Sequence, residues 1–97
     1  METLTKSVKV ENMASPRGGD VPNQFEIRTA DGVYFQSYKS IIAFRPYDRT
    51  QPVMLDATYW DYSTTTGKYR NQFLNEKKAE TEKKIKDGVY ILADLNA

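Results

Sequence analysis

The sequence contains neither cysteine nor histidine. Without cysteine there is no disulfide framework, no thiol nucleophile and no thiolate metal site. Without histidine there is no imidazole base, no catalytic triad of the usual kind and no histidine-ligated zinc or iron. The routes to catalysis that remain are carboxylates, lysine, tyrosine or a hard metal held by oxygen atoms. We therefore expect a protein that is not an enzyme and that uses no cofactor.

The chain also lacks an excess of either charge, because 14 Lys and Arg are balanced by 13 Asp and Glu, for a net charge of +1. Such a balance gives no overall attraction to nucleic acid or to an anionic membrane, although local patches can exist. No apolar run approaches the roughly 20 residues of a membrane span, and the first residues, METLTKSVKV, are not a secretory signal. We expect no membrane association and a cytoplasmic location.

A length of 97 residues and a hydrophobic content of 39% predict a single domain, residues 1–97, with one modest core. Alternating apolar residues predict a first strand over 4–13, and two prolines and two glycines predict a flexible loop over 14–23. Three further strands are predicted from SIIAFR (40–45), from VMLDATYW (53–60), which ends near Asp56 to Tyr59, and from VYILADL (89–95).

Residues 24–37, QFEIRTADGVYFQS, have the pattern of a β-hairpin, and its turn decides which side chains face the core. A two-residue turn at Asp31 and Gly32 would mix apolar and polar side chains on each face. A three-residue loop from Ala30 to Gly32 pairs Ile27 with Phe35 and gives Gly32 the left-handed position. The apolar face then comprises Phe25, Ile27, Val33 and Phe35. The opposite face carries Glu26, Arg28, Tyr34, Gln36 and Tyr38.

The rest of the chain has the character of two helices. Large apolar residues recur at helical spacing over 65–74, residues 76–86 are strong helix formers with mixed charge, and Gly88 is the expected stop. We therefore predict an α+β fold, in which an antiparallel sheet of about five to six strands has two C-terminal helices packed on one face. The expected core is Phe25, Ile27, Phe35, Ile41, Ala43, Leu55, Trp60, Phe73, Leu74, Ile85 and Ile91.

The segment DYSTTTGKYRNQFLNE (61–76) contains a Gly-Lys pair like that of phosphate-binding loops. The motif also requires a glycine where this chain has Tyr62 and a hydroxyl residue where it has Tyr69. The hydroxyl residues are better explained as a helix N-cap. An anion-binding role stays open as the weaker interpretation, because free N–H groups, hydroxyls and a lysine can hold a phosphate. Its candidate residues are Ser63, Thr65, Thr66 and Lys68.

Tyrosines combined with basic residues form a second group of candidates. Such a mixture suits protein contacts, and it also suits the stacking of bases and the holding of phosphates. A purely structural role for these side chains is the third alternative. The candidate partner-binding residues are Arg28, Tyr34, Gln36, Tyr38, Lys68, Tyr69 and Arg70.

Lys68 and Arg70 are predicted to lie near the N-terminus of the first helix. The helix dipole disfavours cations at that end. A bound anion or an acidic partner surface would relieve this electrostatic conflict, so the two side chains point to a partner of negative charge.

Carboxylates offer one catalytic alternative. Asp56 and Asp61 flank an aromatic stretch at a predicted strand end, and they could converge with Asp48 or Glu26 on a hard metal, as in a nuclease. Turn and cap roles explain these residues equally well, and nothing in their spacing requires a metal. We expect no metal site.

Three segments resemble small uncharacterised proteins encoded by bacteriophages and mobile elements of gut and related bacteria. They are GVYFQSYKSIIA (32–43), LDATYWDYSTTTGKYRNQFLNE (55–76) and ETEKKIKDGVYILADLN (80–96). The likeness covers about two-thirds of the chain and leaves out the segment through Val21. That group has no catalytic residues to carry over. The resemblance implies a small accessory protein that acts inside a bacterial host by binding a host factor.

The leading hypothesis is a non-enzymatic binding protein that acts stoichiometrically on a host protein, with an anti-defence inhibitor of the anti-CRISPR kind as its most specific form. The alternative is a small nucleic-acid-binding protein, whose affinity would fall steeply with added salt. An open sheet edge completed by a second copy, giving a homodimer, also stays open.

Overall fold

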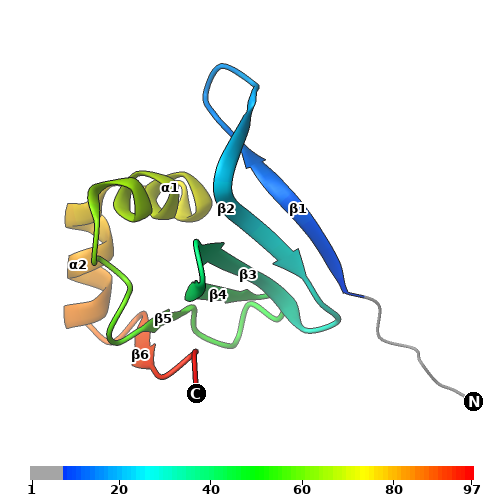
Figure 1. The fold of residues 1–97 in the computed structure, drawn as a ribbon. Helices are drawn as coiled ribbons and strands as arrows, with labels where there is room; N and C mark the ends of the chain where they lie inside the picture. Colours follow the sequence, from blue (N-terminus) through cyan, green and yellow to red (C-terminus); the bar gives the residue numbers. More distant parts are fainter. Residues whose placement is uncertain (1–7) are drawn as a thin grey trace, which may run out of the picture.

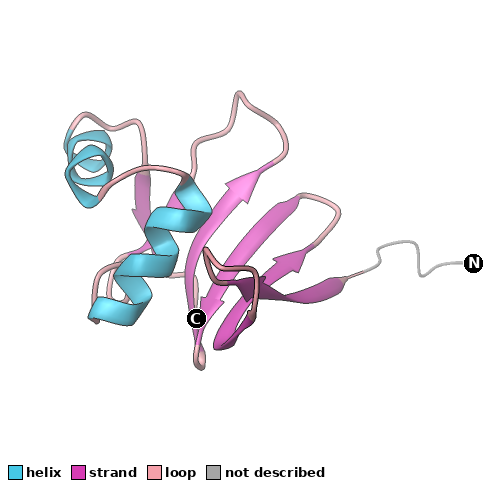
Figure 2. Ribbon diagram, turned by 90° about the horizontal axis from the view of Figure 1, so that it is seen from above, coloured by secondary structure: helices cyan, strands magenta, loops and turns pink. Residues whose placement is uncertain are grey.

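A computed structural model describes residues 8–97, which form one six-stranded sheet with two helices on one side (Figures 1 and 2). The elements are β1 (Lys9–Ala14), β2 (Asp20–Arg28), β3 (Gly32–Ser37), β4 (Ser40–Pro46), β5 (Met54–Asp56), α1 (Thr64–Leu74), α2 (Lys78–Lys86) and β6 (Ile91–Ala93). The predicted α+β fold is confirmed. One correction concerns β6, which pairs parallel to β5 and makes the sheet mixed, because the two helices carry the chain back before it re-enters the sheet.

The hairpin of β1 and β2 is longer than the sequence predicted. The expected first strand over 4–13 lies partly outside the described residues, and β1 covers Lys9–Ala14. The loop expected over 14–23 is confined to the residues between Ala14 and Asp20, where it is closed by a hydrogen bond from the Ser15 N–H to the Gly19 carbonyl at 2.7 Å. Strand β2 therefore begins several residues earlier than predicted.

The predicted register of the β2–β3 hairpin is wrong by one residue. Ile27 lies opposite Tyr34, not opposite Phe35. Thr29 sets this register, because its backbone N–H and its hydroxyl both donate to the Gly32 carbonyl at 2.9 Å, which leaves a two-residue turn. Gly32 is needed for a different reason from the one predicted: a Cβ atom there would collide with the carbonyl oxygen of Arg45 on the neighbouring strand.

The one-residue difference exchanges the two faces of β2. Phe25 and Ile27 share a face with Tyr34 and Gln36, and this face points away from the helices. Val33 and Phe35 point toward the helices, as predicted, but the β2 residues beside them are Glu26 and Arg28. Apolar residues occupy both alternating positions of this hairpin, so the hydrophobic pattern alone could not select the register.

The core lies between the sheet and α1, with aromatic contacts such as that of Phe35 with Phe73, whose ring centroids are 5.7 Å apart. The buried cluster comprises Met13, Val33, Phe35, Ile42, Ala43, Leu55, Tyr69, Phe73 and Tyr90. Among the predicted core residues outside this cluster, Trp60, Leu74 and Ile85 are partly buried and pack against it. Phe25, Ile27, Ile41 and Ile91 do not belong to it. An irregularity in the β3–β4 ladder turns Ile42 inward in place of Ile41.

Asp56, at the end of β5, holds the C-terminal part of the chain in place. Its Oδ2 accepts hydrogen bonds from the N–H groups of Thr58 and Tyr59, and its Oδ1 accepts from the Leu95 N–H at 2.8 Å. Burial disfavours the ionised carboxyl, but these donors outweigh burial and hold the pKa of Asp56 below its ordinary value. Asp56 is therefore a structural carboxylate that fixes β6 beside β5.

Replacement of this carboxylate gives a pH-dependent prediction. Asp56→Ala should lower the free energy of unfolding at pH 7 by about 3 kcal/mol, because buried backbone donors lose their acceptor. A lowered folded-state pKa adds stability that is present above the unfolded value of about 3.8 and lost as the pH falls through the folded value. Urea unfolding from pH 7 to pH 2 should show the difference between the two proteins shrinking in acid. A pH-independent difference would contradict the prediction.

Candidate functional site

Hydroxyl groups fix the start of α1 to the sheet. Ser63 is the N-cap residue, and its Oγ accepts a hydrogen bond from the Thr66 backbone N–H at 3.1 Å, as the capping interpretation predicted. The Thr66 side chain is fully buried, and its Oγ1 lies 2.8 Å from the Oγ of Ser37 on β3. Thr66 is therefore occupied in the core and is not available to an anion.

Arg70 lies on the inner side of α1, with only 1% of its surface exposed. Its Nη1 donates to the Trp60 carbonyl and to Asp61 Oδ1, each at 2.9 Å, and its Nη2 donates to Asn71 Oδ1. The guanidinium also lies 5.1 Å from the centroid of the Trp60 ring. The electrostatic conflict predicted for Arg70 is thus relieved inside the chain, and the residue is not on a partner-binding surface.

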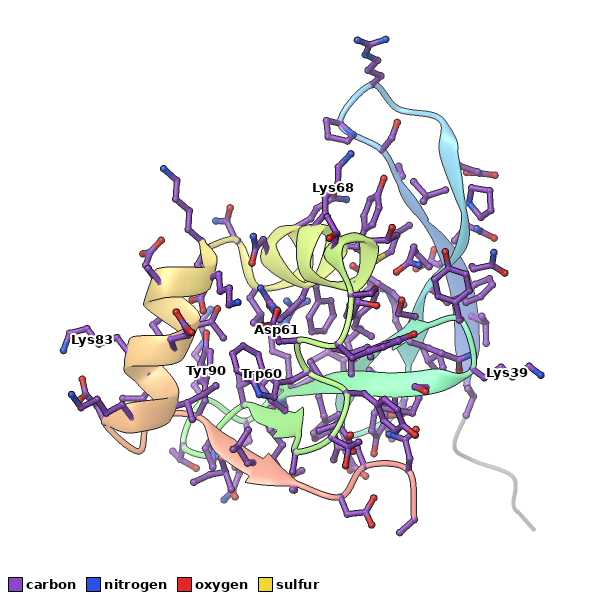
Figure 3. The ribbon with its side chains drawn as sticks, turned by 60° about the vertical axis from the view of Figure 1, so that its left-hand side comes forward. Lys39, Trp60, Asp61, Lys68, Lys83 and Tyr90 are labelled. Atoms are coloured by element: carbon purple, nitrogen blue, oxygen red, sulfur yellow. The ribbon has the colours of Figure 1, made fainter. Side chains whose placement is uncertain are left out.

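Asp61 joins Arg70 to α2, where Lys78 Nζ lies 2.7 Å from the second carboxylate oxygen. Figure 3 shows Asp61 between the two helices and Lys68 on the outer side of α1. Burial disfavours the ionised carboxyl, but hydrogen bonds from Lys78 and Arg70 outweigh it and lower the pKa of Asp61. The carboxylate therefore already occupies the position beside these cations that a bound anion would take.

A depression of about 640 Å³ lies over this junction. Of the four predicted anion-binding residues, Ser63 and Lys68 line it, whereas Thr65 and Thr66 do not. Its cations are Lys68, Lys78 and Arg70, and the last two are already paired with Asp61. The depression therefore carries three cations against one carboxylate, and two of the cations share that carboxylate.

A continuous row of apolar side chains crosses the sheet on the face turned away from the helices. Residues paired across neighbouring strands share a face, so the ladder places one residue from every strand in this row. Its members, which we call the open-face row, are Val10, Ile27, Tyr34, Phe44, Met54 and Ile91. Beside it lies a second, mixed row of Asn12, Phe25, Gln36 and Ile41. Neither row contains a charged residue.

The open-face row is exposed at its two ends and packed in its middle. Val10 is 60% exposed and Ile91 is 42% exposed, while Phe44 is only 8% exposed and its ring centroid lies 4.4 Å from that of Tyr34. Phe44, Met54 and Ile91 line a hollow of about 400 Å³. The rest of its lining is Pro46 at the end of β4 and the loop residues Asp31, Asp48, Gln51 and Pro52. The face therefore combines an apolar row with a hollow beside it.

Tyr38 stands at the tip of the β3–β4 hairpin, beside Lys39, which projects away from the molecule (Figure 3). Its φ angle is +56°, a conformation that is unusual for a bulky residue, and its side chain is 47% exposed. The Tyr38 N–H donates to the Asn23 carbonyl at 2.7 Å, and Gln36 Nε2 donates to the Tyr38 carbonyl at 2.7 Å. The surrounding hydrogen bonds thus hold an exposed aromatic ring in a strained position.

The remaining predicted partner-binding residues do not join this surface. Arg28 lies on the opposite face from Tyr34, and its guanidinium is paired with Glu11 at 2.8 Å and with Glu26 at 3.1 Å. Tyr69 is buried in the core. The prediction that Arg28 shares a face with Tyr34 is therefore wrong, because it depended on the incorrect hairpin register.

The carboxylates considered for a metal site lie in separate settings. Asp56 and Asp61 are held as described above, Glu26 is paired with Arg28, and Asp48 accepts from the backbone N–H and the hydroxyl of Thr50. Among residues 8–97 there is no group of three or more acidic side chains placed to hold a metal ion. The convergence that the nuclease alternative required does not occur.

Two features were missed by reasoning from the sequence. Glu76 has a nearly buried carboxylate whose Oε1 accepts hydrogen bonds from Lys84 Nζ and from the Tyr90 hydroxyl, which ties α2 to the segment before β6. The open-face row was the second, although the apolar residues on both sides of SIIAFR were a signal for it. A strand that is apolar on both sides has apolar side chains on both faces of the sheet. Which residues of the neighbouring strands lie beside them on the second face is known only once the register is known.

These features define a small α+β domain with one sheet face packed on helices and the other open and apolar. The chain belongs to DUF8033, a family of unknown function whose model matches residues 8–88. That range ends at Gly88, just before β6. No curated protein and no solved structure matches the chain. Within residues 8–97, no helix is long and apolar enough to span a membrane.

The buried guanidinium gives a prediction for stability. Arg70→Ala should lower the free energy of unfolding by about 3 kcal/mol, because the Asp61 carboxylate and the Trp60 carbonyl lose a charged hydrogen-bond donor that is itself buried. Lys68→Ala, two residues earlier on the exposed side of α1, should change it by less than about 0.5 kcal/mol. Chemical denaturation of both variants measures the difference. Equal effects would show that Arg70 is not the junction of the helices.

The strained hairpin tip gives a second prediction. Tyr38→Gly should raise the free energy of unfolding by up to about 1 kcal/mol, because glycine adopts positive φ without a steric cost. Lys39→Gly, at the neighbouring position of the same turn, should not stabilise, because Lys39 does not have a positive φ angle. Thermal unfolding of the two variants tests this. A destabilised Tyr38→Gly variant would show that contacts of the tyrosine ring stabilise the fold by more than the backbone strain destabilises it.

Proposed function

We propose that this protein is a non-enzymatic binding protein, encoded by a phage or mobile element, that acts stoichiometrically on a host protein in the bacterial cytoplasm. The open-face row is the observation that carries the proposal. Soluble proteins rarely expose a contiguous apolar surface unless it meets a partner. Here a row of apolar side chains crosses all six strands, packed at Phe44 in its middle and exposed at its ends, Val10 and Ile91.

Strain at the hairpin tip supports the same role. Tyr38 holds an exposed aromatic ring at a position where glycine would be less strained. Backbone strain of this kind persists mainly where it serves a function, and tyrosine is a favoured residue at protein contacts. The tip therefore extends the contact surface beyond the open-face row.

The charge distribution favours a protein partner over a nucleic acid. The open-face row has no cation to meet a phosphate, Arg28 is already paired with two carboxylates, and Arg70 is buried. A partner for this surface would itself present apolar or aromatic side chains, one of which enters the hollow beside Phe44. An inhibitor of a host defence system, for example of the anti-CRISPR kind, is the most specific form of the proposal.

Capture of a host protein from bacterial lysate tests the proposed surface. Ile91→Asp places a charge on the open face, and Tyr38→Ala removes the ring at the tip. Each should weaken saturable capture at least about tenfold, because a few aromatic and apolar contacts carry most of the binding energy at interfaces. Val89→Asp and Tyr62→Ala are the matched controls, since Val89 and Tyr62 are comparably exposed but lie outside the row.

The competing outcomes are separable. Equal loss in the controls and in the open-face variants would show that capture is nonspecific, and no saturable partner at all would count against the proposal. Binding to single- or double-stranded nucleic acid that falls steeply with added salt would instead support the nucleic-acid alternative. Thermal unfolding of each variant establishes that loss of capture is not loss of fold.

A further inference from the structure

Strand β1 is one outer edge of the sheet, and within residues 8–97 no strand pairs with its outward side (Figure 1). Val8 is 62% exposed and Val10 is 60% exposed. Toward the end of the strand the edge is closed, because Gln72 of α1 donates a hydrogen bond to the Ala14 carbonyl at 2.7 Å. The free part of the edge is therefore short, and its centre is Val10.

The hydrogen bonds of the β2–β3 ladder reveal which groups of β1 point outward. The backbone groups of Asn23 and Thr29 form hydrogen bonds on the β3 side of β2. In an antiparallel sheet these groups alternate in direction along a strand, so the even-numbered residues of β2 turn theirs toward β1. Those residues include Glu26 and Arg28, which pair with Glu11 and Lys9 of β1. The other residues of β1 must therefore point their backbone groups outward. They are Val8, Val10 and Asn12, whose outward donors and acceptors have no backbone partner within residues 8–97.

Symmetry restricts how a second copy can pair with this edge. Two identical strands pair antiparallel about a two-fold axis perpendicular to the sheet, and each side chain keeps its face. Opposed residues must then lie on the same face and so differ by an even number of positions. The axis therefore passes through a residue and not between two residues, and within the free stretch that residue is Lys9, Val10 or Glu11. An axis at Lys9 opposes two lysines, and an axis at Glu11 opposes two glutamates. Only an axis at Val10 places each Lys9 opposite a Glu11 of the other copy.

We propose that two copies of this protein pair antiparallel through β1, about a two-fold axis at Val10, and form one continuous sheet with six strands from each copy. This register opposes Val8 with Asn12 and pairs the whole free stretch of the edge. Val10 meets Val10 of the second copy, so the two open-face rows join end to end. The inference goes beyond the proposed function, because it concerns the backbone edge of the sheet, although Val10 also belongs to the open-face row.

The opposite edge does not offer the same selection. Strand β6 has only three residues, Ile91–Ala93, and none of them is charged, so charge cannot set a register there. Lysine on an edge strand can also act as a guard against association. If Lys9 were such a guard, removal of its charge would increase self-association. If Lys9 pairs with Glu11 of the second copy, removal of its charge should decrease self-association.

A charge exchange tests the proposal by sedimentation equilibrium. The wild type should be a reversible dimer, and Lys9→Glu and Glu11→Lys should each raise the dimer dissociation constant at least about tenfold, because both symmetry-related pairs become repulsive. The double variant K9E/E11K restores opposite charges across the axis, so its dissociation constant should return to within about threefold of the wild-type value. The double variant also keeps a carboxylate beside Arg28, because residue 9, which becomes glutamate, lies opposite Arg28 in the β1–β2 ladder.

A backbone variant gives independent evidence. Val10→Pro removes an outward N–H without removing a β1–β2 hydrogen bond, so it should yield a folded monomer. Val10→Thr is the matched control, because it keeps the N–H and the branched shape and should remain dimeric. A monomeric wild type at all concentrations, an unchanged Lys9→Glu dimer, or a double variant that stays monomeric would each overturn the proposal. The Val10→Pro variant retains Tyr38 and Ile91, the two residues that the capture experiment tests. Capture of host protein by this monomer therefore tests the proposed function independently of dimer formation.

Discussion

The hydrogen bonds of Thr29 set the register of the β2–β3 hairpin, and the two faces of the sheet depend on that register. Because the Thr29 N–H and hydroxyl share the Gly32 carbonyl, the turn is restricted to two residues. Phe35 then packs on Phe73 under α1, while Ile27 and Tyr34 turn to the other side. A slip of one residue would exchange these sets, so a polar interaction in a turn decides where the apolar surfaces lie.

The two helices are joined to each other by charged side chains that pair inside the chain. Arg70 meets Asp61 and a backbone carbonyl, Asp61 continues to Lys78, and Glu76 binds Lys84. A buried cation with its partner removed is costly, whereas one that is held by several hydrogen bonds fixes the geometry of the elements that it connects. Arg70, which looks like part of a ligand site in the sequence, is for this reason part of the framework.

Two surfaces remain after the framework is complete: the open-face row and the free edge of β1. They are connected, because Val10 belongs to both. A two-fold axis perpendicular to the sheet keeps both open faces on the same side of the assembly. A dimer would therefore present two copies of the apolar surface in one direction, and paired sites of this kind gain avidity on a symmetric or clustered partner.

The sequence by itself determined the types of most elements and the chemistry that the protein lacks. Local signals were sufficient for this, as in the Ser63 cap and the Gly88 stop, whose φ angle is +77°. Part of the candidate surface, including Tyr34, Gln36 and Tyr38, was also among the predicted residues. Only the tertiary structure decided which face each strand turns to the helices, that β6 is parallel, and that Arg70 is buried. These outcomes depend on partners distant along the chain, such as Leu95 for Asp56 or Arg45 for Gly32, which no local pattern encodes.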